Sequence, residues 1–159
     1  MISMIVAIDR NNAIGRGGDQ LAYISADLKH FKAVTSGHTI VMGRKTSNAL
    51  PKGTLPNRRN IVVSRNVDCH IEGAEIVHSV DEAIEIMHGD DVYVIGGGEI
   101  YRQFMPKAER LYVTEIDEQF EDADTFFPTI DMQEWLLIEE GEWQTDEKSG
   151  LQFRFKTLI

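Results

Sequence analysis

The sequence predicts an α/β fold in one domain over residues 1–159, with a central, mixed and mostly parallel eight-stranded sheet, about four flanking helices and a C-terminal antiparallel hairpin. Three observations predict this architecture. Short runs rich in Ile and Val alternate with segments of helical periodicity. Two early strands end in basic residues, as expected where open α/β sheets bind ligands at their carboxyl edge. The last residues alternate between apolar and polar side chains, which favours a hairpin.

The elements are expected in the following order. Strands are predicted at residues 1–8, 39–42, 60–64, 75–78, 92–95, 111–116, 135–143 and 151–159. Helices are predicted at residues 25–35, from Gly43 to Leu50, at 81–87 and at 99–105. Residues 13–19 hold three glycines within four positions and predict a mobile loop, which is well placed to be a lid. Residues 120–128 predict a loop of acids and aromatics.

The first predicted helix carries an acid on its apolar face. Asp27, Phe31 and Val34 are spaced at i, i+4 and i+7, so they share one side of the helix. Burying an unpaired carboxylate is costly. One interpretation is structural: Ser25 caps the helix, and Asp27 favours the positive end of its dipole. The other is functional: Asp27 lies at the base of a pocket and binds a cationic or amide-like ligand edge.

The charge distribution narrows the classes of partner. The formal net charge of −10 argues against nucleic acid or an anionic membrane. No Asp or Glu occurs from Leu28 to Val67, whereas this stretch holds eight of the sixteen Lys and Arg residues. It predicts either a site for anionic ligands or a solvated basic face. The five histidines show no metal-ligand spacing, so we expect no metal.

The cysteine count and the hydropathy of the sequence indicate the cellular compartment in which the protein is expected. Cys69 is the only cysteine, so no internal disulfide is possible. The apolar run from Ile2 to Ile8 is too short to span a membrane and lacks a basic leader. We therefore expect a cytoplasmic protein, and a monomer, because no long exposed apolar helix demands a partner.

Two junctions between a strand and a helix suggest anion binding. In the first, Gly43 is followed by a basic pair at a helix start, where free N–H groups and two cations converge. In the second, the strand at 92–95 runs into three glycines, which allow close approach of the backbone to a pyrophosphate. This is not the Rossmann fingerprint, because Tyr101 stands where a glycine would be needed, and the triple glycine alone is a weak signal.

Taken together, the ordered motifs resemble those of bacterial chromosomal dihydrofolate reductases over nearly the whole chain. The matching segments are Ile5-Val6-Ala7, Ile14-Gly15, Ala26-Asp27-Leu28, Phe31-Lys32, Met42-Gly43-Arg44-Lys45-Thr46, Leu55-Pro56-Asn57-Arg58-Arg59-Asn60, Val63-Ser64-Arg65, Ile95-Gly96-Gly97-Gly98-Glu99-Ile100-Tyr101, Tyr112-Val113-Thr114-Glu115-Ile116-Asp117, Asp124-Thr125 and Phe127-Pro128. The resemblance implies the fold, the use of NADPH and the reduction of dihydrofolate to tetrahydrofolate in one-carbon metabolism. It also implies that antifolates are inhibitors.

The resemblance assigns roles on the substrate side. Asp27 would bind the amidine edge of the pterin ring, supported by Thr114. Arg58 would clamp the α-carboxylate of the substrate in a bidentate ion pair. The other residues expected to contact the substrate are Ile5, Ala7, Leu28, Phe31, Lys32, Leu55 and Ile95. Hydride would pass from the nicotinamide to pterin C6, with a proton from water at N5.

The resemblance likewise assigns a cofactor site. The adenosine side of NADPH, including its 2′-phosphate, would contact Arg44, Lys45, Thr46, Ser64 and Arg65. The pyrophosphate and nicotinamide would contact Ala7, Ile14, Gly15, Gly43, Gly96, Gly97, Gly98, Glu99, Ile100 and Tyr101. The family joins the first two glycines of its triplet by a cis peptide, and the loop from Gly15 to Gln20 would close over the nicotinamide.

The chain departs from the family pattern ahead of the first helix. Ala22 stands where the family usually has tryptophan, and Ser25 where it has proline. Losing the large indole could loosen lid closure or misplace the substrate, which predicts a working but slower enzyme with an altered antifolate response. Two alternatives stay open: a pyrimidine- or riboflavin-pathway reductase of the same fold, and a non-catalytic NADPH- or folate-binding module whose site has decayed at Ala22.

Overall fold

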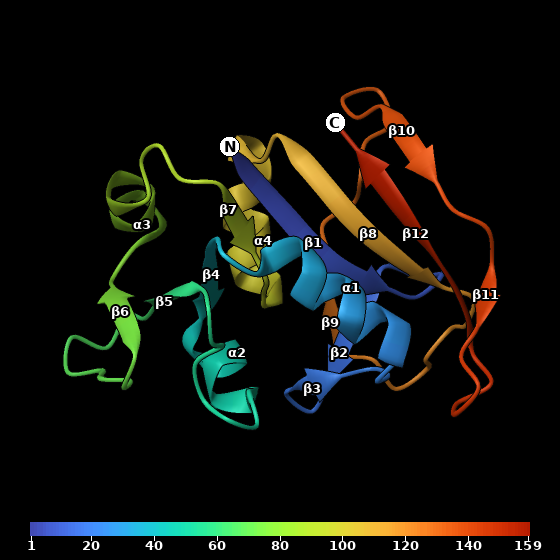
Figure 1. Ribbon diagram of the computed structural model, residues 1–159, viewed down its shortest axis with the longest axis horizontal. Coiled ribbons are helices and arrows are strands. Elements are labelled where there is room, and N and C mark those ends of the chain that lie inside the picture. The colour runs from blue at the N-terminus through green and yellow to red at the C-terminus, as the bar shows by residue number, and fades with distance from the viewer.

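The computed structural model describes residues 1–159 and is built on one large twisted sheet (Figure 1). Eight of its strands run in the order β10-β12-β8-β1-β7-β4-β5-β6, and β11 pairs with β12 beside them. Their bounds are β1 (Ile2–Ile8), β4 (Thr39–Gly43), β5 (Arg59–Val63), β6 (Ala74–Val77), β7 (Val92–Val94), β8 (Arg110–Ile116), β10 (Leu137–Glu140), β11 (Gln144–Thr145) and β12 (Gln152–Leu158).

The sheet is mixed and mostly parallel, as the sequence predicts. The strand pairs β1–β7, β1–β8, β4–β7, β4–β5 and β5–β6 are parallel. Strand β12 runs antiparallel to β8, β10 and β11 and forms the expected C-terminal hairpin. The carboxyl ends of β1, β4, β5, β7 and β8 therefore lie at one edge of the sheet, where open α/β sheets bind ligands.

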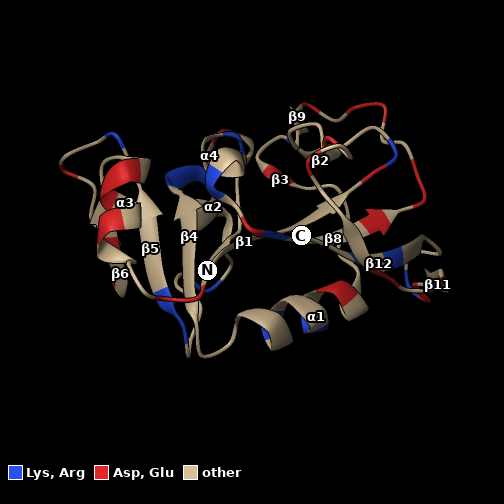
Figure 2. Ribbon diagram, turned by 90° about the horizontal axis from the view of Figure 1, so that it is seen from above, with Lys and Arg blue, Asp and Glu red and all other residues tan.

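Four α-helices cover the sheet on both faces: α1 (Ser25–Thr35), α2 (Arg44–Ala49), α3 (Val80–Ile86) and α4 (Gly98–Phe104), the last continued by the 3₁₀ turn η1 (Met105–Lys107). Figure 2 shows α1 alone on one side of the sheet, with α3 and α4 on the other. The main core lies between the sheet and α3 and α4, where Met4, Val94 and Phe104 are fully buried.

A second, small sheet differs from expectation. Residues predicted as loops form β2 (Ala13–Arg16), β3 (Asp19–Gln20) and β9 (Thr125–Phe126), ordered β3-β2-β9. Gly17 and Gly18 adopt φ of 57° and 81° and provide the tight turn between β2 and β3. Strand β9 lies more than a hundred residues beyond β2 in the sequence, so no local sequence pattern could predict that β2 pairs with β9.

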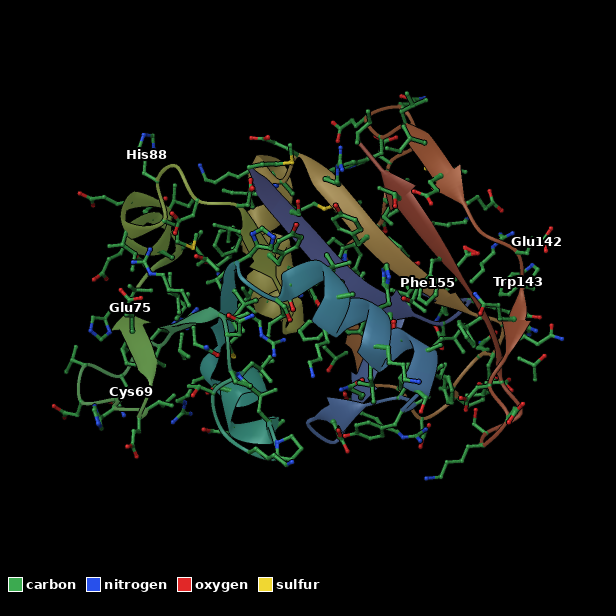
Figure 3. The ribbon with its side chains drawn as sticks, in the orientation of Figure 1. Cys69, Glu75, His88, Glu142, Trp143 and Phe155 are labelled. Carbon is green, nitrogen blue, oxygen red and sulfur yellow. The ribbon has the colours of Figure 1, made fainter.

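Three smaller observations complete the fold. Helix α1 has the predicted bounds, but Ser25 is not its cap: Ile24 is the N-cap and makes no side-chain capping bond. Cys69 is a free, half-buried thiol between β5 and β6, at the end of the molecule (Figure 3). No helix is both long enough and apolar enough to cross a bilayer.

Candidate active site

The site begins with Asp27, in the first turn of α1. The Thr114 hydroxyl on β8 donates a hydrogen bond of 2.6 Å to Asp27 Oδ1, whereas Oδ2 accepts none from the chain. Burial raises the pKa of the Asp27 carboxyl, while the Thr114 bond and the nearby His30 lower it. The structure thus brings together the predicted pair and leaves one carboxylate oxygen available to a ligand.

His30 lies one helical turn from Asp27 and was not expected at the site. Its ring stacks on Phe155 of β12, with centroids 4.3 Å apart and planes at 29° (Figure 3 labels Phe155). Burial lowers the pKa of His30, and the charges of Asp27 and Glu139 oppose that shift. The helical spacing of His30 and Asp27 was readable from the sequence, but the stacking partner on β12 was not.

Apolar side chains around Asp27 form a wall that is only partly covered. Ile5 on β1 is buried, and Ala7 and Phe31 are half-buried. Leu28, on the next helical position, is 44% exposed. Leu55 and Ile95 pack against the cluster of Ile40, Met42 and Val62 on the same face of the sheet. An exposed leucine beside an available carboxylate suits a flat ligand with one polar edge.

Tyr101 ties the triple-glycine turn to β1. Its buried hydroxyl donates to the Ile5 carbonyl at 2.7 Å, and burial raises its pKa, so it stays protonated. Gly96 has φ of 123° and is joined to Gly97 by the expected cis peptide. A Cβ at Gly96 would lie 3.3 Å from the Tyr101 ring, so the turn packs directly on this side chain.

Arg58 lies beyond the C-terminal end of α1 and is held by uncharged acceptors. Its Nε donates to the Pro56 carbonyl at 2.9 Å and its Nη1 to Thr35 Oγ1 at 3.1 Å. Partial burial lowers the pKa of the guanidinium, and no carboxylate pairs with it. Thr35 is fully buried and was missed by sequence reasoning, because nothing in the helical pattern singles it out. Lys32 is exposed one turn earlier on α1.

The other wall is built from backbone. The Gly43 N–H donates to the Gly96 carbonyl at 2.8 Å, which joins the start of α2 to the triple glycine. A Cβ at Gly43 would lie 3.1 Å from Ile100 Cγ1, and one at Gly98 would lie 2.9 Å from Thr125 Cγ2. A Cβ at Gly97 would lie 3.4 Å from Thr46 Oγ1. The short distances at Gly43 and Gly98 leave little room for a side chain, so glycine permits this close packing of the backbone.

The predicted phosphate-binding side chains follow two neighbouring strands. Arg44 and Lys45 open α2 after β4, are exposed and form no ion pair. Ser64 and Arg65 follow β5; Ser64 is buried and its hydroxyl accepts from the Asn66 amide. In Figure 2 Lys and Arg residues colour α2 and patches of α1, whereas α3 is acidic. Arg44 and Lys45 thus place unpaired positive charge at the start of α2, whereas Arg65 is paired with Glu99.

The small sheet closes the site at the side of Ile14 and Gly15. Asp124 Oδ2 accepts from the Gly17 amide at 2.9 Å, and Arg16 Nη1 donates to Asp122 Oδ1 at 2.9 Å. The Tyr23 hydroxyl donates to Asp19. Asp122, Asp124 and Tyr23 were not predicted as contributors. A separate hollow of about 310 Å³, lined by residues such as Asp9, Glu115 and Trp143, contains none of the predicted site residues.

Comparisons with known proteins agree with this geometry. A model of the family described as dihydrofolate reductase matches residues 1–159. The chain is 40% identical over 156 residues to a dihydrofolate reductase of Bacillus subtilis (strain 168), covering 98% of this chain and 92% of the relative. It is 40% identical over 159 residues to a dihydrofolate reductase type 3 of Salmonella typhimurium, covering 99% and 97%. A solved structure of dihydrofolate reductase from Enterococcus faecalis, complexed with NADP(H) and RAB-propyl, aligns with a TM-score of 0.92 at 34% identity, covering 99% of this chain and 95% of that one.

The fold, the glycine-lined wall and these similarities define an NADPH-dependent oxidoreductase. Within that class, the chain belongs to the dihydrofolate reductase family. The residues on the cofactor side fit NADPH. The unpaired cations Arg44 and Lys45 follow β4 and the triple-glycine turn follows β7, so both lie at the carboxyl edge of the sheet. The rival assignment to a pyrimidine- or riboflavin-pathway reductase is not supported.

Proposed function

We propose that this single domain reduces 7,8-dihydrofolate by transfer of a hydride to pterin C6 and of a proton to N5. The observation that supports this most strongly is the Asp27 carboxylate, held at Oδ1 by Thr114 and free at Oδ2. An amidine edge presents two parallel N–H groups, which suit such a carboxylate. NADPH would supply the hydride, and water the proton at N5.

Asp27 acts by position and charge in this proposal. Burial raises the pKa of Asp27 and so lowers the free-energy cost of protonating its carboxyl, which favours sharing a proton with the ring edge. A fixed negative charge then favours the protonated, electron-poor ring that accepts a hydride. Ile5, Leu28 and Phe31 hold the ring flat and exclude water from the reacting face.

Arg58 clamps the α-carboxylate of the substrate. Two neutral acceptors, the Pro56 carbonyl and Thr35 Oγ1, orient its guanidinium without neutralising it. The remaining N–H groups can form the bidentate pair that arginine makes with carboxylates. Lys32, one turn away on α1, adds a second positive charge on the same side.

The cofactor side divides into two parts. The backbone around Gly43 and the triple glycine approaches the pyrophosphate, and Tyr101, Ile14 and Gly15 flank the nicotinamide. The 2′-phosphate is bound by the basic and hydroxyl side chains after β4 and β5, namely Arg44, Lys45, Thr46, Ser64 and Arg65. Phosphate groups bound by arginine forks and helix N-terminal amides favour NADPH over NADH.

The test is the loss of NADPH absorbance with and without dihydrofolate, in the wild type and in Asp27→Asn. We expect turnover only with dihydrofolate, and its loss in Asp27→Asn with NADPH affinity unchanged. Asp81→Asn, an exposed acid in the first turn of α3, is the matched control and should keep wild-type turnover. NADPH binding without turnover in the wild type would instead favour a binding module.

A further inference from the structure

The carboxylate of Glu99 pairs with a cation of the proposed phosphate site. Arg65 Nη2 and Glu99 Oε1 are 2.7 Å apart, and both side chains are exposed. Gln103 Nε2, one turn along α4, lies 3.5 Å from the same oxygen. The sequence expectation placed Glu99 among residues lining the cofactor, but its side chain is directed to Arg65.

The pair spans the carboxyl ends of three neighbouring strands. Arg65 follows β5, and Glu99 lies in the first turn of α4, which follows β7. Strand β4 lies between β7 and β5, and α2 begins directly after it (Figure 1). The ion pair therefore connects the two elements on either side of the α2 start, across the edge at which the cofactor is expected to bind.

Arg65 is the exception among the cations of this edge. Arg44 and Lys45 form no ion pair, and the stretch from Leu28 to Val67 contains no acid that could supply one. The carboxylate that meets Arg65 comes from a distant part of the chain. A phosphate that binds Arg65 must displace this carboxylate or share the guanidinium with it, close to a like charge.

We propose that Glu99 is a specificity-determining residue: it competes with the 2′-phosphate of NADPH for Arg65, and it thereby lowers the preference for NADPH over NADH. This inference rests on the proposed phosphate site after β4 and β5. The effect is a few-fold, because exposed ion pairs are weak and are screened by salt. NADH lacks the 2′-phosphate, so its affinity does not depend on this exchange.

A structural role for Glu99 makes a different prediction. An acid in the first turn of a helix is favoured by the helix dipole. If Glu99 served only that purpose, Glu99→Gln would lower the melting temperature and change the affinity for both cofactors alike. Discrimination between the two cofactors is therefore the readout that separates the two roles.

The experiment is a double-mutant cycle on Glu99 and Arg65, with dissociation constants for NADPH and NADH measured at low and high salt. Glu99→Gln should tighten NADPH binding about three- to tenfold at low salt and leave NADH within about twofold. Arg65→Gln should weaken NADPH about tenfold or more, with NADH unchanged. In the Arg65→Gln background, Glu99→Gln should give no gain. Glu85→Gln, an exposed acid on α3 without an ion pair, should change neither cofactor.

The double-mutant cycle distinguishes a failure of the Glu99 proposal from a failure of the proposed phosphate site on which it rests. If Arg65→Gln weakens NADPH selectively but Glu99→Gln does not tighten it, competition by Glu99 is wrong and the phosphate site stands. A gain from Glu99→Gln that persists without Arg65 is general charge repulsion, and it also overturns competition for Arg65. If Arg65→Gln leaves discrimination unchanged, the phosphate site itself is misplaced.

Discussion

Replacing Thr114 by valine isolates the hydrogen bond that holds Asp27. The side chain is 2% exposed and valine has nearly the same shape, so the main loss is the 2.6 Å bond to Oδ1. Hydrogen bonds to charged groups contribute about 1.5–3 kcal/mol. The loss falls on the ionised carboxyl, so the pKa of Asp27, already raised by burial, moves further up.

The assay is the affinity of the NADPH-bound enzyme for a 2,4-diaminopyrimidine antifolate between about pH 4 and pH 8. Under the proposed function such a ligand would bind as a cation to ionised Asp27, so the acid limb of the affinity profile would report protonation of this carboxyl. In Thr114→Val we expect the acid limb at higher pH. On the acid limb the affinity of Thr114→Val for the antifolate should be roughly 10- to 100-fold lower than that of the wild type. At higher pH the two affinities should become equal.

Thr39→Val is the matched control, because Thr39 Oγ1 donates to Asp90 Oδ2 at 3.0 Å at the N-terminal end of β4. It removes the same kind of bond away from Asp27 and should lose some stability without moving the acid limb. An acid limb at the same pH in Thr114→Val and wild type would refute the role given to Thr114. A shift of equal size in Thr39→Val would show that the effect is not local.

Three further outcomes are expected. Thr35→Val should raise the KM for dihydrofolate about three- to tenfold with kcat unchanged, because Arg58 loses its Nη1 acceptor; Thr35→Ser should not, and an equal loss of kcat would argue against a binding role. Ala22→Trp should raise turnover, by up to about 100-fold, and alter antifolate affinity; steady-state kinetics showing neither would count against our account of Ala22. Asp27→Asn should stabilise the fold toward neutral pH. Because burial raises the folded-state pKa of Asp27 above its unfolded-state pKa, the folded protein retains the proton to higher pH than the unfolded chain does. Wild-type stability therefore falls as pH rises through the interval between the two pKa values, and a gain in Tm that is independent of pH would contradict this.

Much of the fold was readable because its signals are local. The Ile- and Val-rich strands and the helix carrying Asp27 each show their own periodicity, and α1 has the predicted bounds Ser25–Thr35. The small sheet was missed because β2 pairs with β9, which lies far along the chain. Short, glycine-rich strands carry no alternation of their own, so their pairing is set by tertiary contacts.

The candidate site divides in the same way. Asp27 with Thr114 and the glycine turn could be anticipated because motif order carries them. The orientation of Arg58 by Thr35 and the pairing of Arg65 with Glu99 could not, since each depends on two elements meeting in space. Ion-pair partners in particular follow from geometry, and residue type alone does not specify them.

The unneutralised guanidinium of Arg58, just before β5, and the unpaired Arg44 and Lys45, just after β4, have a consequence for encounter kinetics. Although the whole chain carries a formal charge of −10, the local field around each of these unpaired cations attracts anions. Folates and dinucleotide phosphates should therefore associate faster at low ionic strength, and added salt should slow their capture, the opposite of what the overall charge would suggest.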